Sequence, residues 1–326
     1  MITWPTTVKR KISVISNGYA WGENWWGQLG LGTRNNMEHI PTEISGNFLW
    51  HSLATGGVHC LGIRSDGLLF AWGGNHLDQL GIGNSNVMYI STPVQIGVDH
   101  WSFISCRHHS LGIRLDGLLF AWGDNWAGQL GDGTTINKNV PTQIGNHRWS
   151  FAAAGGSHSL GIRSDGLLFA WGSNWAGQLG DGTTIDKHTP AQISSNIWRG
   201  AHTSGGAMHS FAYQQDGSLF GWGANWHGRV GTGSFDEYIL TPTRLPNNNS
   251  WLAAYAGGMH SLGITFDYVG WGWGSSESGQ LGFISGWQNP FIRTPILIQN
   301  TQKRFKHFSV GDFHSLGILL DLGGLA

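Results

Sequence analysis

Short apolar stretches alternate with turn-forming residues along the chain, most clearly between residues 149 and 193. Residues 149–156 (WSFAAAGG) and 159–163 (SLGIR) form two expected strands, and residues 164–166 (SDG) contain the Asp-Gly pair of a tight hairpin. Residues 167–172 (LLFAWG) are apolar on both faces, as in a strand covered on both sides. After the glycine-rich connection 173–189, residues 190–193 (PAQI) predict a short edge strand. Four antiparallel strands in about fifty residues make one β-propeller blade.

This unit recurs along the chain. Trp-Gly pairs begin at six positions, at intervals of 49 to 51 residues: Trp21, Trp72, Trp122, Trp171, Trp222 and Trp273. A histidine, mostly followed by Ser-Leu, also recurs six times: His59, His109, His158, His209, His260 and His314. A period near fifty residues is typical of a radial array of blades, because one blade alone cannot bury both of its faces.

The sequence therefore predicts an all-β fold, a single β-propeller domain spanning residues 1–326. Complete units cover residues 50–96, 101–144, 149–193, 198–245 and 251–298. We expect residues 305–321 and 12–44 to supply strands from both ends of the chain to a sixth blade, which would close the ring and remove exposed edges. Seven blades are the alternative, because residues 11–16 (KISVIS) form a second-strand pattern that competes with residues 315–320 (SLGILL).

Composition narrows the functional classes. With 18 basic and 19 acidic residues among 326, the chain has no electrostatic reason to bind nucleic acid or an anionic membrane. The two cysteines, Cys60 and Cys106, have neither metal-site nor disulfide-framework spacing. No apolar stretch has the length of a signal peptide or a membrane span. We expect a cytoplasmic protein, or one exported without a cleaved signal peptide.

The recurring phrase GGSHSLGIRSDGLLFAWGSNWAGQLGDGTTIDKHTPAQI at residues 155–193 resembles the repeat of the regulator of chromosome condensation family, and within it the alpha-tubulin-suppressor-like bacterial type. The resemblance covers roughly residues 12–321. It implies a β-propeller, usually with seven blades. In this family the founding member is a chromatin-bound exchange factor for the small GTPase Ran, and relatives include interaction domains of ubiquitin ligases, bacterial effectors and a secreted β-lactamase inhibitor. Exchange activity there depends on a protruding wedge, and no long insertion in this chain matches it.

The two repeated series have structural interpretations. The six Trp-Gly indoles are expected to pack between blades, because large aromatic side chains dominate core burial. The six histidines are expected to bond to neighbouring turns, since equivalent positions on different blades lie around a circle and do not converge on one ion. No Ser, His and carboxylate arrangement stands apart from the repeat. We expect no enzyme, no metal and no cofactor.

A third series is the candidate binding site. One position in each long connection follows an asparagine, or Ser276 in the last, and is occupied by Trp25, His76, Trp126, Trp175, Trp226 or Glu277. Trp287 lies in the least repetitive connection. If these side chains face solvent, they display a partial aromatic circle on one rim. In the alternative, each indole covers the edge of the adjacent blade.

Three hypotheses follow. The first is a non-catalytic module that binds a protein partner through a propeller rim, and we expect it to be a monomer. The second is a lectin-like binder that holds a glycan through the loop tryptophans. The third is a guanine nucleotide exchange factor for a Ran-like small GTPase, as the resemblance implies for some relatives.

Overall fold

The computed structural model describes residues 16–34, 37–199, 204–205, 208–246, 249–282, 290–298, 304–310 and 314–319. Within these ranges the regular structure is β-strand, apart from the single-turn 3-10 helix η1 (Trp226–Gly228). The all-β class predicted from the repeats is confirmed. Among the described residues, no helix has the length and apolar character needed to cross a membrane.

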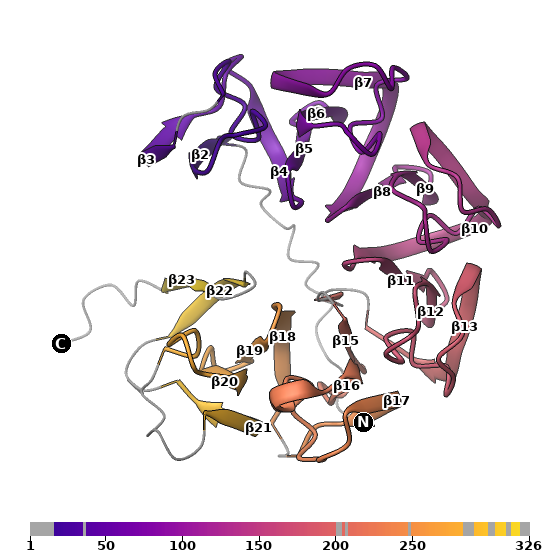
Figure 1. The fold of residues 1–326 in the computed structure, drawn as a ribbon, viewed down its shortest axis with the longest axis vertical. Coiled ribbons are helices and arrows are strands. Elements are labelled where there is room, and N and C mark those ends of the chain that lie inside the picture. Colours follow the sequence, from indigo (N-terminus) through magenta and orange to yellow (C-terminus); the bar gives the residue numbers. More distant parts are fainter. Residues whose placement is uncertain are drawn as a thin grey trace, which may run out of the picture.

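Five four-stranded antiparallel blades surround a central axis (Figure 1). They are named here by their first and last strands. The β4–β7 blade contains β4 (Leu49–Thr55), β5 (His59–Arg64), β6 (Leu68–Gly74) and the first part of β7 (Tyr89–Cys106). The β7–β10 blade adds β8 (His109–Arg114), β9 (Leu118–Gly123) and the first part of β10 (Lys138–Ala154). The β10–β13 blade adds β11 (His158–Arg163), β12 (Leu167–Gly172) and β13 (Lys187–Ile197).

The other two blades are separate sheets. The β14–β17 blade contains β14 (Ser204–Gly205), β15 (His209–Tyr213), β16 (Leu219–Ala224) and β17 (Tyr238–Arg244). The β18–β21 blade contains β18 (Trp251–Ala256), β19 (His260–Thr265), β20 (Gly270–Ser275) and β21 (Phe291–Leu297). The first three blades instead form one continuous sheet, because β7 and β10, of 18 and 17 residues, each run from the outer edge of one blade into the first strand of the next.

The ring formed by the described strands is open at one side, called the seam here (Figure 1). On one side of the seam β2 (Tyr19–Gly22) pairs with β3 (Glu38–Glu43), and on the other β22 (Phe305–Val310) pairs with β23 (Ser315–Leu319). The expected pairing between the two ends of the chain is absent from the described strands, since these are two separate two-stranded sheets (Figure 1). Residues 12–15, 320 and 321, which were part of that expectation, lie outside the described residues.

Each half-blade beside the seam is held by a different neighbour. On one side, β1 (Ser16–Asn17) pairs with β4. On the other, Nε2 of His260 lies 2.7 Å from Oγ of Ser315, which joins β23 to the β18–β21 blade. The described residues therefore form five complete blades with a two-stranded half-blade at each side of the opening.

The core lies between neighbouring blades. Leu160 and Ile162 from β11 are fully buried in one cluster with Trp198 and Trp222 from the next blade. This explains the apolar second and third strands of each unit, since both of their faces are covered.

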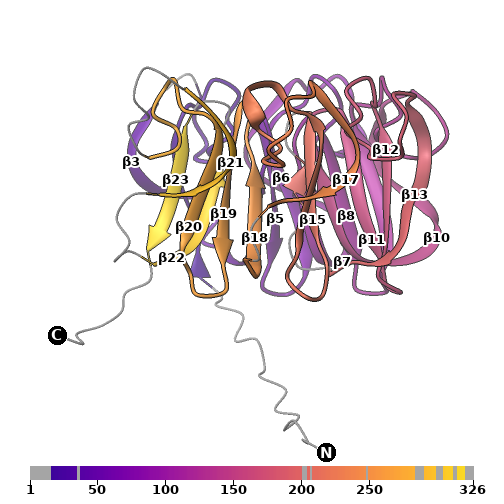
Figure 2. The ribbon, with the colours of Figure 1, turned by 90° about the horizontal axis from the view of Figure 1, so that it is seen from below.

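Strands run across the thickness of the ring, so each connection lies at one of two rims (Figure 2). The long connections that follow the third strands form the loop rim, which is uppermost in Figure 2 and faces the viewer in Figure 1. The Asp-Gly hairpins form the opposite turn rim. The candidate binding residues therefore share one rim.

Candidate functional site

A buried asparagine organises five of the long connections, and Ser276 takes its place in the connection that follows β20. Asn125 is fully buried; its Oδ1 accepts a hydrogen bond from the Leu130 N–H at 2.9 Å, and its Nδ2 donates to the Ile136 carbonyl at 3.0 Å. Asn174 makes the equivalent bonds in the next blade. The side chain that follows this asparagine, Trp126 or Trp175, is consequently held at a fixed point on the loop rim.

A buried glutamine joins the connection of the β7–β10 blade to the following blade. Gln129 Oε1 accepts from the Ala127 N–H at 2.9 Å. Its main-chain oxygen accepts from Trp171 Nε1 at 2.9 Å and from Ser159 Oγ at 2.7 Å. Because both donors belong to the next blade, the loop rim is stiffened by contacts between blades.

Acidic residues complete two of these connections. Asp132 accepts from the Thr134 hydroxyl at 2.8 Å and lies 3.0 Å from the Lys138 ammonium group. Partial burial acts to raise the pKa of Asp132, but hydrogen bonds from Lys138 and Thr134 outweigh it and leave the pKa below its usual value. The Asp132 carboxylate is therefore bonded to residues of its own connection.

The candidate aromatic residues are largely exposed. Trp25, Trp126 and Trp175 are 51%, 60% and 46% exposed. Trp226 is half-buried, and His76 and Glu277 are exposed. Trp287 lies outside the described residues. Three indoles therefore face solvent on the loop rim and do not merely cover the edges of adjacent blades.

An aromatic cluster joins two of these connections. The ring centroids of Trp175 and Trp226 lie 5.7 Å apart, and Tyr238 contacts both rings edge-on, at 6.4 and 5.9 Å. Such offset and edge-to-face arrangements are the favourable ones for aromatic pairs. Trp175 and Trp226 thus present a preformed apolar surface that bridges the β10–β13 and β14–β17 blades.

A buried arginine supports this cluster. Arg229 is 2% exposed, and its guanidinium carbon lies 4.9 Å from the centre of the Trp226 ring. Nε donates to the Ala224 carbonyl at 2.9 Å and Nη1 to the Gly258 carbonyl at 2.6 Å. Burial lowers the pKa of Arg229 to about 10. Among the described residues its Nη2 has no hydrogen-bond partner.

Sequence reasoning missed Arg229 and Tyr238. The signal for Arg229 was available, since GRVGTG carries arginine where neighbouring units read GQLGDG with Gln129 and Gln178. The same reasoning missed Trp26, whose ring lies 5.4 Å from His76. Trp26 and His76 form a smaller aromatic contact on the rim near the seam.

The Trp-Gly indoles occupy the spaces between blades. Trp72, Trp122, Trp171, Trp222 and Trp273 are at most 1% exposed. Trp21 differs at 53% exposed, because β2 borders the open seam. Burial therefore follows the completeness of the blade in which each indole lies.

The repeated histidines join successive blades. The Nε2 atoms of His59, His109, His158, His209 and His260 lie 2.7 to 2.9 Å from the serine Oγ atoms of Ser110, Ser159, Ser210, Ser261 and Ser315. Burial lowers the pKa of His59 and His109 to about 3 and that of His158 to about 4. His314, beside the seam, is exposed. Within the described part of the chain, no three His, Cys, Asp or Glu side chains are grouped to hold a metal ion.

The turn rim carries arginine and aspartate pairs. Arg64 and Asp66 lie 2.6 Å apart, as do Arg114 and Asp116, and Arg163 pairs with Asp165. Each arginine also lies over a phenylalanine of its own blade. In each of these three pairs the two charges neutralise one another within a single turn.

Antiparallel sheets arranged radially, with Trp, His and Ser contacts between successive blades, define a repeat-built β-propeller. The sequence pattern of the Regulator of chromosome condensation (RCC1) repeat matches residues 19–63, 116–162, 165–213, 216–264 and 271–318. The chain belongs to the family of RCC1-repeat proteins.

Known proteins share this fold. The Ultraviolet-B receptor UVR8 of Arabidopsis thaliana is 30% identical over 272 residues, which are 81% of this chain and 62% of the receptor. Human WBSCR16 matches with a TM-score of 0.80 at 18% identity, over 93% of this chain and 87% of that one. Prp20p of Saccharomyces cerevisiae, whose structure was described with its binding properties to Gsp1p and histones, matches with a TM-score of 0.65 at 21% identity, over 95% and 93%. The two structural matches show the fold alone, and the chain spans about three fifths of the receptor's length.

Proposed function

We propose that the protein is a non-catalytic interaction module that binds a protein partner through its loop rim. The observation that carries this proposal is the exposure of Trp25, Trp126 and Trp175 at equivalent positions on one rim. Exposed aromatic side chains on loops held by a rigid scaffold are typical of binding surfaces.

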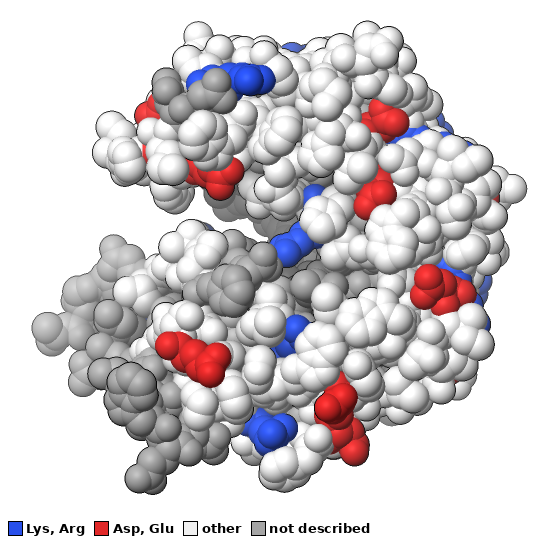
Figure 3. Space-filling view, viewed as in Figure 1, with Lys and Arg blue, Asp and Glu red and all other residues white. Residues whose placement is uncertain are grey.

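The rim meets the physical requirements of a protein interface. Tryptophan and tyrosine are enriched among residues that dominate binding energy, and Trp175, Trp226 and Tyr238 are already packed together before any partner arrives. A preformed surface loses little conformational entropy on binding. Figure 3 shows that most of this face is formed by residues that are neither acidic nor basic, which favours apolar and neutral polar contacts.

Family membership supports an interaction role but leaves the partner open. UVR8 is named as a receptor, and the report on Prp20p concerns Gsp1p and histones. One fold that serves such different proteins does not assign an activity, so the proposal rests on the rim of this chain.

Matched surface variants test the proposal. Partners are captured with the wild-type chain, with Trp126→Ala/Trp175→Ala and with Leu115→Ala, whose side chain is 68% exposed on the turn rim. We expect a saturable partner that is retained by Leu115→Ala and weakened at least tenfold by the double variant. A partner that binds all three proteins equally contradicts the loop-rim assignment.

Exposed indoles among neutral polar residues also favour a second candidate, a glycan ligand stacked on Trp126 and Trp175. A glycan array distinguishes the two candidates, because a lectin binds purified sugars in the absence of any protein partner. For the exchange-factor hypothesis, release of a fluorescent nucleotide from a panel of Ran-like GTPases is the direct measurement, and an unchanged release rate retires it.

A further inference from the structure

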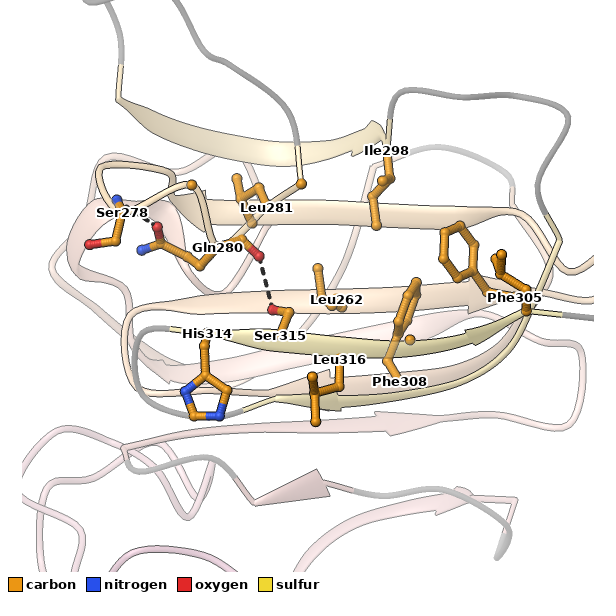
Figure 4. A pocket seen from close by; sticks show the side chains of 14 residues that line it. Leu262, Ser278, Gln280, Leu281, Ile298, Phe305, Phe308, His314, Ser315 and Leu316 are labelled. Carbon is orange, nitrogen blue, oxygen red and sulfur yellow. Dashed lines mark hydrogen bonds between the residues drawn. The ribbon is translucent and has the colours of Figure 1, made fainter. Parts of the chain in front are cut away.

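A cavity of about 530 Å³ lies beside the seam, between the β18–β21 blade and the β22–β23 sheet. Figure 4 shows its walls, which include Leu262, Gln280, Leu281, Ile298, Phe305 and Phe308. Ser315 and Gly317 of β23 line the cavity as well. The volume falls within the roughly 300 to 1,000 Å³ typical of ligand pockets.

The same position between complete blades is filled by an indole. Trp171 Nε1 donates to the Gln129 main-chain oxygen at 2.9 Å, and the Trp171 ring lies 5.8 Å from that of Trp149. In the repeat, Gln129 and Trp149 correspond to Gln280 and Phe305. Both counterparts line the seam cavity. The cavity therefore has the walls of an indole socket.

The glycines show which socket holds no indole from the described part of the chain. A Cβ atom added at Gly30, Gly81, Gly131, Gly180 or Gly231 would lie 2.6 to 2.8 Å from an indole nitrogen or carbon of the next blade. At the equivalent Gly282, the nearest atom is Ile298 Cγ2, at 3.5 Å. The described residues thus place an indole in five sockets and leave the sixth without one.

The socket adjoins a free strand edge. In a complete blade the second strand pairs with the third, as Ser159 does with Trp171. The equivalent β23 pairs only with β22 among the described strands. Leu316 and Ile318 on β23 are 56% and 59% exposed, although their counterparts in complete blades are fully buried.

Trp21, the equivalent of Trp171 in the repeat, is held away from this socket. Trp21 belongs to β2, and Asn17, just before β2, pairs with Leu49 of the β4–β7 blade. After β2, the Gln28 main-chain oxygen accepts from Trp72 Nε1 at 3.0 Å. Contacts on both sides of Trp21 therefore anchor β2 to the β4–β7 blade, across the seam from the socket.

We propose that the seam cavity is a docking site for a tryptophan carried on an extended strand of a partner protein. The partner strand pairs with the free edge of β23, the mode called β-augmentation. Its indole enters the cavity, donates to the Gln280 main-chain oxygen and packs against Phe305. Gln280 O already accepts from Ser315 Oγ at 2.9 Å and, like Gln129 O, has a second lone pair for the indole N–H. The cavity does not include Trp126 or Trp175, so this proposal and the proposed function can fail independently.

A peptide taken from this chain is the probe. Residues 165–174 (DGLLFAWGSN) supply the third strand and the indole to the matching socket of the β10–β13 blade. The peptide, extended with lysines for solubility, is titrated into the full chain by isothermal calorimetry. We expect saturable binding with one peptide per chain, weakened at least tenfold when the tryptophan of the peptide is replaced by alanine.

Protein variants locate the peptide. Leu316→Lys, on the exposed edge of β23, is expected to weaken binding at least tenfold with an unchanged melting temperature, whereas Leu115→Lys on the turn rim leaves binding intact. No binding by the wild type, or equal binding of the two peptides, overturns the proposal. Binding that appears only with Trp21→Ala shows that the chain's own indole fills the socket. A dimer that the peptide dissociates shows that a second copy fills it, and either result also overturns the proposal.

Discussion

Nε2 of His158 lies 2.9 Å from Oγ of Ser210 in the next blade, and this hydroxyl also lies 2.9 Å from the main-chain oxygen of Gln178. Because the hydroxyl donates its proton to the carbonyl, it accepts from the imidazole, and Nε2 of His158 carries the proton. The neutral tautomer is thereby fixed by a relay that crosses a blade interface. Equivalent relays recur at His109 and His209.

These relays predict that the fold loses stability in mild acid. The pKa of His59 and His109 is about 3 and that of His158 about 4 in the folded chain, against about 6.5 when unfolded. Above pH 6.5 both states are neutral and stability is complete. As pH falls below 6.5, the unfolded chain takes up protons that the folded chain does not, at a cost of about 2 kcal/mol per histidine at pH 5. Urea unfolding followed by tryptophan fluorescence should show a much lower midpoint at pH 5 than at pH 7.5, and a level midpoint contradicts this.

Removal of one hydroxyl tests the relay itself. Ser210→Ala leaves the Nε2–H of His158 and the carbonyl of Gln178 with one partner fewer inside the core. We expect a loss of about 1 to 3 kcal/mol in the free energy of unfolding, the usual cost of burying an unsatisfied polar group. Ser164→Ala, at an exposed hairpin position, is the control and should change stability by less than about 0.5 kcal/mol. Equal effects of the two replacements argue against the relay.

One experiment should distinguish the buried Trp-Gly indoles from the exposed indoles of the loop rim. Trp171 is fully buried and Trp126 is 60% exposed. Trp171→Ala removes a buried indole and should cost about 3 to 5 kcal/mol of unfolding free energy. Trp126→Ala should cost less than about 1 kcal/mol while weakening partner binding. Urea unfolding and a binding assay on the same proteins measure both, and a strongly destabilised Trp126→Ala variant would assign that residue to the scaffold.

Much of the fold is predictable from the sequence because it repeats. Trp171 and His158 recur with a period near fifty, and a residue that recurs in this way meets the same neighbours in each blade. The Asp-Gly and Trp-Gly pairs gave the order of strands in a blade for the same reason. The candidate positions on the loop rim were also predictable, since Trp126 and Trp175 follow the same asparagine in their units.

Features that break the repeat were not predictable. The exposure of the Trp126 side chain depends on how far the next blade extends over it. The fifty-residue repeat of the sequence does not indicate this. The open seam could not be predicted from the sequence. Closure requires β2 and β23 to meet across the ring, whereas local contacts hold each of them to a different neighbour. Arg229 and Tyr238 come together only when the β14–β17 blade folds, because the arginine lies under Trp226 and the tyrosine beside it.

Two glycines separate backbone strain from packing between blades. Gly131 has a φ of +80°, and a Cβ atom there would lie 2.7 Å from Trp171 Nε1. Gly145 has a φ of +59° with nothing within 4 Å of such an atom. Alanine at either site pays roughly 1 to 2 kcal/mol for the left-handed backbone, and at Gly131 the clash with the indole adds about 1 to 3 kcal/mol. Urea unfolding of Gly131→Ala and Gly145→Ala should therefore give a clearly lower midpoint for Gly131→Ala, because only that residue closes the socket of a neighbouring blade. Equal midpoints would mean that the indole moves aside without cost and that the blade interface is looser than its contacts indicate.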